Sequence, residues 1–215
     1  MNNKNIKIED NFLNQEEFNK IRNIMTGVPD EASAPYGLPW YYTPNYYEFN
    51  DEKKSSSEYW LPDVHEPEIC PFLEEGHWML QFTHTFYEFH TPRSPYMDRI
   101  NCILERWRPA SISRIRANLL TRLPDGHQKF FSMHGDMENL QEDKQKQWTV
   151  SIFYVNTNDG YTVFEDGTKV ESVANRMLTF PANMKHTGSS CTDEQIRVVI
   201  NFNYINKGEN NGRSL

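Results

Sequence analysis

The second half of the chain is divided by tight-turn signals into short alternating segments, and this pattern constrains the fold more than any other feature. From about residue 112, apolar and polar side chains alternate with a period of two, as expected of strands. Asn158-Asp159-Gly160 and Asp166-Gly167 are strong hairpin signals between such segments. A run of short strands joined by such turns predicts a β-sandwich or a β-barrel. The predicted strands lie at 112–119, 148–156, 161–165, 169–173, 177–180 and 196–204.

The first half of the chain follows a different pattern. Ile6 and Ile8 alternate as in a short edge strand, and residues 14–26 carry apolar side chains at helical spacing. Residues 69–108 are also predicted to be mostly helical, because aromatic and aliphatic side chains recur there at helical intervals. Helices first and strands later make the chain α+β, with the helices packed on one outer face of a sheet. The apolar positions that carry these predictions include Phe18, Ile21, Ile24 and Met25, and then Phe82, Phe86 and Phe89.

Composition narrows the class of protein. The chain has 215 residues, 37% hydrophobic and 13% aromatic, and a formal net charge of −8. The length suits one domain, and the aromatic content argues against a disordered chain. No apolar stretch approaches the ~18 residues of a membrane span, no secretory signal opens the sequence, and the net acidity disfavours binding of duplex nucleic acid. We expect one domain over 1–215, with a helical and loop-rich part at 1–111, a strand-rich core at 112–206 and a flexible tail at 207–215.

The three cysteines, Cys70, Cys102 and Cys191, are widely and irregularly spaced. Without a C-x-x-C pair they match neither a zinc ribbon nor a thioredoxin-like motif. An odd number of cysteines fits free thiols in a reducing compartment, so we expect a cytoplasmic protein in which these side chains are small buried groups.

His134 and Asp136 stand two residues apart at the end of a predicted strand. Side chains at i and i+2 of a strand leave on the same face, so the imidazole and the carboxylate can converge on one point. An H-x-D triplet is weak evidence by itself, because it arises easily by chance. The triplet becomes significant because His186 follows further along the chain and Arg197 opens the last alternating strand.

Two His and one carboxylate on one face of a metal leave three coordination positions open. This set suits a non-haem Fe(II) centre that binds a co-substrate and dioxygen together. A cationic Arg on a neighbouring strand can clamp a dicarboxylate by a bidentate pair while the other end of the acid chelates iron.

With these residues, the sequence resembles the Fe(II)- and 2-oxoglutarate-dependent dioxygenases, in particular the prolyl-4-hydroxylase-like branch. Within that branch it is similar to small dioxygenases encoded by marine T4-like bacteriophages. The resemblance covers roughly residues 112–205 and includes the strand at 149–156, the segment 159–164 and the Asn175-Arg176 turn. The segment Asp10-Asn11-Phe12-Leu13, with the helix after it, also resembles the same branch, but less strongly.

The resemblance implies a double-stranded β-helix, or jelly roll, with iron at its open end. It makes His134, Asp136 and His186 the metal ligands. It makes Arg197 the partner of the distal carboxylate of 2-oxoglutarate. The further co-substrate contacts that it carries over by position are Tyr154, Thr162, Asn201 and Asn118.

The implied reaction consumes 2-oxoglutarate and dioxygen, with ascorbate as a candidate reductant, and releases succinate and CO2 while a C–H bond is hydroxylated. Asp136 favours hydroxylation over halogenation, because a small residue there would open a halide site. A peptidyl proline is the leading substrate, and a nucleotide or another small molecule stays open. We expect a small-molecule or peptide substrate, no duplex nucleic acid, no membrane, and a monomer or homodimer. The expected location is the cytoplasm, which is the host cytoplasm for a phage-encoded enzyme.

Other readings stay open beside this one. A metal-binding jelly roll could serve without catalysis as a sensor or a virion component, although such a module has no reason to keep a dicarboxylate clamp. Arg114 and Arg116 share one strand face and could contact substrate, but salt bridges are the commoner explanation. The aromatic segment 40–47 could be a substrate lid, with the packing of a loop-rich extension as the favoured alternative. Packing, surface or loop roles are expected for His65, His77, His84, His90 and His127.

Overall fold

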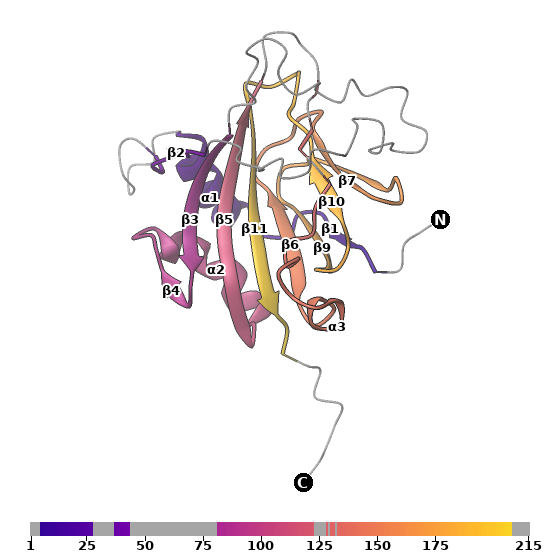
Figure 1. Cartoon of the computed structure of the whole chain (residues 1–215). Coiled ribbons are helices and arrows are strands. Elements are labelled where there is room, and N and C mark those ends of the chain that lie inside the picture. The colour runs from indigo at the N-terminus through magenta and orange to yellow at the C-terminus, as the bar shows by residue number, and fades with distance from the viewer. Residues whose placement is uncertain are drawn as a thin grey trace.

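The largest element of the fold is an eight-stranded antiparallel sheet. The computed structural model describes residues 5–27, 37–43, 81–122, 128, 130–131 and 133–207. Within the sheet the strands follow the order β1-β9-β6-β11-β5-β3-β2, and β4 pairs with β3 off this path (Figure 1). The strands are β1 Lys7–Glu9, β2 Tyr41–Tyr42, β3 Gln81–Glu88, β4 Thr91–Pro92, β5 Ser111–Thr121, β6 Thr149–Tyr154, β9 Arg176–Pro181 and β11 Ile196–Ile205.

A smaller antiparallel sheet faces the inner side of the large one. It has the order β10-β7-β8, built from His186–Gly188, Tyr161–Phe164 and Lys169–Glu171. A buried cluster joins β6, β9 and β11 of the large sheet to β7 and β8 of the small one. Two facing antiparallel sheets with these crossings form the predicted jelly roll. Strand β10 was not predicted, because three residues give too short a pattern to detect.

The outer side of the large sheet is covered by helices. Helix α1 spans Gln15–Thr26, η1 spans Met97–Ile100 and α2 spans Asn101–Trp107, while the short α3, Glu142–Gln145, lies elsewhere (Figure 1). Asn14 caps α1 by accepting a hydrogen bond from the backbone of Glu17, and Gly27 ends the helix at a φ of 72°. Within the described residues, no helix combines the length and the apolar character needed to cross a membrane. The buried side chains of α1 are the predicted ones, Phe18, Ile21, Ile24 and Met25.

Alternation along β11 sends its side chains into two different cores. Val198 and Ile200 pack with the helices in the outer cluster, whereas Val199 belongs to the cluster between the sheets. Arg197 and Asn201 share the alternation of Val199, so they lie on the inner face of the large sheet. The polar residues that the sequence singles out on this strand therefore face the interior of the jelly roll.

The prediction that residues 69–108 are mostly helical is wrong over its described central part. Residues 81–88 form the strand β3, and only 97–107 are helical. Phe82 and Phe86 lie four residues apart, a spacing that shares one face of a strand as well as of a helix, so the spacing could not discriminate. β-Branched threonines between them favour a strand, and pairing with β5 along nearly its whole length stabilises one. Residues 69–80 lie outside the described residues.

Of the remaining expectations for the first half of the chain, some are confirmed and others concern residues outside the described ranges. The edge strand near Ile6 and Ile8 is confirmed as β1, which pairs with β9. In the aromatic segment 40–47, Trp40 packs against the outer core and residues 41–42 form β2, while 44–47 lie outside the described residues. Cys102 and Cys191 are free thiols, and Cys70 is not among the described residues.

Candidate metal centre and anion pocket

Backbone pairing brings the two predicted histidine ligands together. His134 lies in a short extended segment that pairs antiparallel with β10, through bridges from Phe130 to Ser189 and from His134 to His186. The two histidines exchange backbone hydrogen bonds of 3.0 Å in both directions. Their imidazole rings are consequently 5.1 Å apart between centroids, at an interplanar angle of 40°.

Asp136 joins this pair from the turn that follows His134. Its side chain is 3% exposed, and its Oδ1 accepts a hydrogen bond of 3.0 Å from Nη2 of Arg114. The other oxygen, Oδ2, is buried without a hydrogen-bond partner among the described residues and lies 3.9 Å from Nε2 of His186. A buried carboxylate oxygen without a partner is costly, so this atom is suited to bind a cation.

His186 is held in the form that a metal ligand requires. Burial lowers the pKa of its imidazole most strongly, the nearby Asp136 raises it and His134 lowers it again. The net shift is downward, so the ring is neutral at neutral pH. Its Nδ1 donates to the carbonyl oxygen of Met184 at 3.3 Å, which directs the lone pair of Nε2 toward Asp136.

The three side chains are gathered but do not yet form a closed coordination sphere. Ligand atoms at about 2.1 Å from one ion and at right angles to each other are about 3 Å apart, less than the 3.9 Å between Asp136 and His186. Within the described part of the chain, no three His, Cys, Asp or Glu side chains already stand in an arrangement that could hold a metal ion. The donor set itself fits a divalent cation, because it offers a neutral imidazole and an unpaired buried carboxylate oxygen.

Arg197 provides a second feature, a buried cation. The residue is 4% exposed. Its Nε donates to Oγ of Ser172 at 2.8 Å and its Nη2 to Oγ1 of Thr162 at 3.4 Å. No carboxylate of the described residues forms an ion pair with it, and burial lowers the pKa of its guanidinium. Because arginine stays protonated in proteins, a buried guanidinium of this kind favours an anionic ligand.

Hydroxyl groups surround this guanidinium. Tyr154 donates from its phenol to Oγ1 of Thr162 at 2.8 Å, and the Tyr154 ring centre is 5.7 Å from the Arg197 guanidinium carbon. Burial raises the pKa of Tyr154, which keeps the phenol neutral. The structure therefore brings Tyr154 and Thr162, two of the expected co-substrate contacts, to Arg197. Ser172 was missed, although its alternation with the buried Val170 pointed to an inward polar side chain.

Two glycines make room for the side chain of Arg197, because neither has a Cβ atom. A Cβ at Gly160 would lie 2.6 Å from Cδ of Arg197, and a Cβ at Gly188 would lie 3.2 Å from its Nη1. Any larger residue would push against the guanidinium. In the sequence, Gly160 stands out only as part of a hairpin signal, and Gly188 does not stand out.

The buried guanidinium of Arg197 and the histidine pair are connected by one strand, β10. His186 and Gly188 are two residues apart on β10, and they pair with Phe164 and Thr162 of β7. Two strand residues span about 7 Å, which matches an extended five-carbon dicarboxylate between Arg197 and a metal held by His186. The geometry therefore supports one ligand with two anionic ends.

Two predicted co-substrate contacts are not brought to Arg197. Asn118 lies on the inner face, but its amide oxygen accepts a hydrogen bond of 3.4 Å from Gln81. Asn201 stands opposite Arg116 in the register of β5 and β11, further along the sheet. Neither forms a hydrogen bond with Arg197 within the described residues. Alternation puts both side chains on the inner face, and strand register decides which residues they stand opposite.

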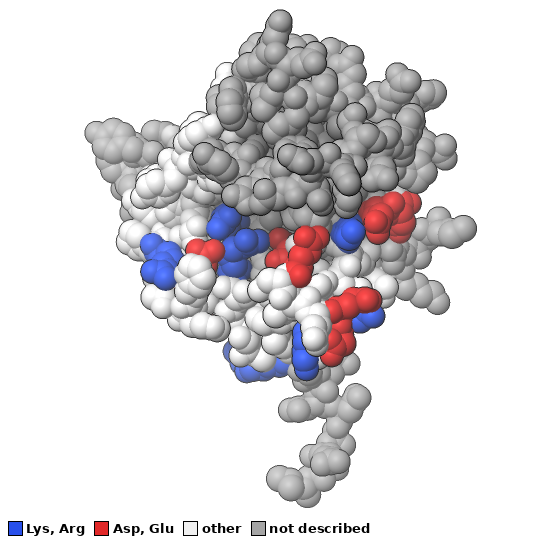
Figure 2. Space-filling model, viewed as in Figure 1, with Lys and Arg blue, Asp and Glu red and all other residues white. Residues whose placement is uncertain are grey.

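The charged residues Arg114 and Arg116 lie on the inner face beside the histidine pair. Arg114 pairs with Asp136 at 3.0 Å, and Arg116 pairs with Glu88 at 3.3 Å. Figure 2 shows acidic and basic side chains side by side in a band across the middle of this view of the molecule. The expected salt bridges are therefore present, and one of them is made to a predicted metal ligand.

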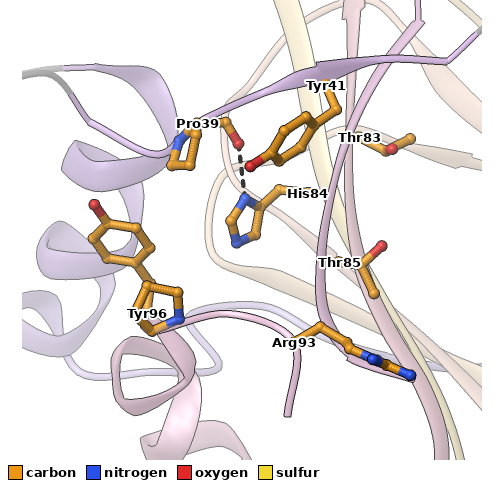
Figure 3. Close-up of a pocket in the computed structure, with 8 residues that line it drawn as sticks. Pro39, Tyr41, Thr83, His84, Thr85, Arg93 and Tyr96 are labelled. Atoms are coloured by element: carbon orange, nitrogen blue, oxygen red, sulfur yellow. Dashed lines mark hydrogen bonds between the residues drawn. The ribbon is translucent and has the colours of Figure 1, made fainter. Parts of the chain in front are cut away.

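A pocket of about 550 Å³ lies at the end of the large sheet where β2 and β4 flank β3. Figure 3 shows Pro39, Tyr41 and Tyr96 around His84. His84 is 3% exposed, and its ring nitrogens form hydrogen bonds of 2.7 Å with Pro39 and Ser94. Burial lowers its pKa. With both nitrogens occupied, His84 has the packing role expected for it.

Comparison with known proteins supports the fold. No protein-family model and no curated protein matches the sequence. Among solved structures, the chain is similar to the non-heme alpha ketoglutarate dependent epimerase SnoN from nogalamycin biosynthesis, with a TM-score of 0.53, 8% identity and coverage of 94% of this chain and 78% of that one. It is also similar to a prolyl hydroxylase in complex with a hypoxia inducible factor peptide fragment, from Trichoplax adhaerens, with a TM-score of 0.50, 10% identity and coverage of 95% and 85%. At these identities the likeness shows the jelly-roll fold, and function has to be argued from the site.

Proposed function

We propose that the protein is an Fe(II)- and 2-oxoglutarate-dependent oxygenase that hydroxylates an unactivated C–H bond. The observation that carries this proposal is the buried guanidinium of Arg197, which has no carboxylate partner among the described residues and lies one strand segment away from the His134–His186 pair. A metal site alone would not need such a group. The two similar structures, an alpha ketoglutarate dependent epimerase and a prolyl hydroxylase, have the same fold.

The residues of the site would have separate roles in binding the metal and the co-substrate. His134, Nε2 of His186 and Oδ2 of Asp136 would hold the ferrous ion, and Arg197 would bind the distal carboxylate of 2-oxoglutarate through a bidentate pair. Thr162 would donate its hydroxyl hydrogen bond to the same carboxylate, and Tyr154, whose phenol donates to Oγ1 of Thr162, would orient that hydroxyl group. When bound, the iron supplies the oxidative chemistry that converts 2-oxoglutarate and dioxygen to succinate and CO2 while one oxygen atom enters the substrate. The buried walls of the inner core exclude water from this reaction.

Arg114 positions the carboxylate of Asp136 in this scheme. By donating to Oδ1 at 3.0 Å it leaves only Oδ2 available to a cation. A carboxylate that binds through one oxygen leaves a coordination position free for dioxygen or the co-substrate. The contact therefore favours the open metal site that an oxygenase requires.

For the substrate, a peptidyl proline is the first candidate, because the similar prolyl hydroxylase was solved with a peptide fragment. The cytoplasmic location, the monomeric or dimeric state, the accessory ascorbate and the phage origin stay expectations from the sequence.

A non-catalytic metal-binding jelly roll, acting as a sensor or a virion component, is the second candidate function. Its supporting observation is that the predicted ligands are not already in a metal-holding arrangement. Such a module would bind a metal ion without needing 2-oxoglutarate.

Anaerobic titration with Fe(II) and then 2-oxoglutarate separates the two candidates. The oxygenase should give a weak visible charge-transfer band, and Arg197→Gln should need far more 2-oxoglutarate to give it. Arg122→Gln, at an exposed site directly after β5, is the matched control. No band, or a band unaffected by Arg197→Gln, would contradict the proposal. Succinate release in the presence of candidate substrates, with Asp136→Ala as the blank, then tests turnover.

A further inference from the structure

Four polar side chains form a rectangle on the inner face of the large sheet. In the register of β5 and β11, Arg114 stands opposite Asn203 and Arg116 stands opposite Asn201. Directly opposed residues of an antiparallel pair place their Cβ atoms about 5 Å apart. We call these four residues the inner-face quartet.

The quartet holds nearly all of the unpaired buried polar atoms in the described residues. Five of the six such side-chain atoms belong to it: Nε of Arg114, Nε of Arg116, Oδ1 of Asn201, and both amide atoms of Asn203. The sixth is Oδ2 of Asp136, the atom assigned above to the metal. Asn203 is 1% exposed. Because buried polar groups are almost always paired, this concentration indicates a ligand that would pair them.

The charges of the quartet also favour a ligand. Arg114 and Arg116 are on the same face two residues apart, and among the described residues each forms an ion pair with one carboxylate, Asp136 or Glu88 respectively. Burial and the neighbouring Arg114 charge lower the pKa of Arg116. The two arginine side chains are 29% and 28% exposed, although their unpaired Nε atoms are buried. An anion between the two guanidinium groups would relieve their repulsion.

The unpaired atoms define the chemistry of that ligand. The quartet offers three donors, which are the two guanidinium N–H groups and the Asn203 amide nitrogen, and two acceptors, which are the amide oxygens of Asn201 and Asn203. The complement is a carboxylate next to an N–H donor. Inorganic phosphate at neutral pH has only one or two O–H donors, fewer than the three N–H donors of an ammonium group, and serves as a competing ligand in the test below. An internal prolyl residue has neither a carboxylate nor an N–H, so it would leave the quartet unpaired.

We propose that the inner-face quartet binds the α-carboxylate and the adjacent N–H group of the substrate, which is a free α-amino acid. The carboxylate lies between Arg114 and Arg116, and the ammonium group donates to Asn201 and Asn203. Arg114 also contacts Asp136, so a ligand held there has its side chain beside the metal site. This inference rests on the proposed function and replaces a peptidyl proline by an amino acid as substrate.

The test measures binding to the full chain rather than turnover. The anaerobic protein is loaded with Fe(II) and 2-oxoglutarate and titrated calorimetrically with each of the common L-amino acids, with inorganic phosphate and with a blocked prolyl peptide, while the charge-transfer band is recorded. At least one amino acid should bind with a Kd below about 1 mM and should shift the band. The N-acetyl derivative of that amino acid imitates a peptide C-terminus. We expect it to bind more weakly, because it has lost the ammonium group.

Variants then assign the binding to the quartet. Arg116→Gln and Asn203→Leu should each weaken binding of the amino acid by about 30-fold and leave the affinity for 2-oxoglutarate unchanged. Arg99→Gln, which removes a surface ion pair with Asp98, is the matched control and should change neither. Asn203→Leu is near in size and removes unpaired atoms, so the fold should be retained.

The outcomes distinguish this inference from the proposed function. A charge-transfer band without binding of any amino acid overturns the inference alone, as does binding of only inorganic phosphate or a blocked prolyl peptide. Quartet-dependent binding of an amino acid without the band supports the inference and overturns the oxygenase proposal. Equal binding by the N-acetyl derivative supports carboxylate recognition but overturns the assignment of a free amino acid.

Discussion

The backbones of His134 and His186 exchange two hydrogen bonds of 3.0 Å, although two hairpins separate the residues in sequence. Their relative position is therefore set by main-chain pairing, and not by the imidazoles themselves. This pairing connects the segment that carries Asp136 to the strand that leads to the Arg197 pocket. A change of either side chain can remove metal binding without removing the bridge that organises the site.

Replacing His186 tests this separation. We expect His186→Gln to weaken Mn(II) binding by more than about 100-fold, since it removes a ligand and ligand partners alone account for 10–100-fold effects. The far-UV circular dichroism should not change, because the backbone pairing stays. His90→Gln, at an exposed turn, should leave metal affinity as it was. Equal metal affinity in the two variants would remove His186 from the ligand set.

Replacing Arg197 by Lys tests the co-substrate clamp. Lysine keeps a charge but cannot form a bidentate pair and would leave Ser172 and Thr162 with altered partners. We expect the KM for 2-oxoglutarate to rise by about 100-fold with the metal affinity unchanged. Succinate formation over a range of 2-oxoglutarate concentrations measures this. Arg122→Lys provides the comparison, and a KM unaffected by Arg197→Lys would refute the clamp.

The glycines beside Arg197 should differ in their sensitivity. In Gly188→Ala the new Cβ meets only the end of the guanidinium, at 3.2 Å, so we expect a rise of about threefold to tenfold in the 2-oxoglutarate KM with little loss of stability. In Gly160→Ala the Cβ also lies 3.0 Å from the backbone oxygen of Ser190. That variant should lose about 1–3 kcal/mol in denaturant unfolding as well. A larger loss of stability in Gly188→Ala than in Gly160→Ala would contradict the packing described.

Asn175 joins the first segment of the chain to the jelly roll. Its amide donates to the carbonyl of Leu13 at 2.8 Å and accepts from the Leu13 backbone N–H at 2.9 Å, and its φ is 62°. Asn175→Ala should lower the free energy of unfolding by about 2–5 kcal/mol, from unpaired groups and left-handed strain. Asn175→Gly should lose about 1 kcal/mol less, because glycine adopts this φ freely. Urea unfolding checks both, with Asn19→Ala, at a half-buried position of α1, as the control.

The ion pair between Asp10 and Arg176 predicts a pH dependence. Hydrogen bonds of 2.6 and 3.1 Å from Arg176 lower the pKa of Asp10. A carboxylate with a lowered folded-state pKa stabilises the fold above its unfolded pKa of about 4, and this stabilisation disappears as the pH falls through the folded-state value. The side chain of Asp10 is 53% exposed, so the effect is at most about 1 kcal/mol. Asp10→Asn should therefore destabilise at pH 7 and be neutral near pH 2. Equal destabilisation at both values would exclude the ion pair as the cause.

Periodicity predicted those parts of the fold that repeat locally. The helix after Asn14, with its buried Phe18 and Ile21, and the inward face of Arg197 both follow from spacing along the chain, because each depends on neighbours within one element. The strand at 81–88 was mistaken for a helix because Phe82 and Phe86 fit both periods. Only pairing with β5, distant in sequence, decides between the two.

The sequence by itself determined the residue types of the candidate site: two histidines, a carboxylate and an arginine in an order that a jelly roll can bring together. Only the tertiary structure decided their neighbours. It placed Ser172 against Arg197, Arg114 against Asp136, and Asn201 opposite Arg116 rather than in the anion pocket. Alternation fixes the face of a side chain, because it is a property of one strand. Register fixes its partners, and register arises only when strands far apart in the sequence pair with one another.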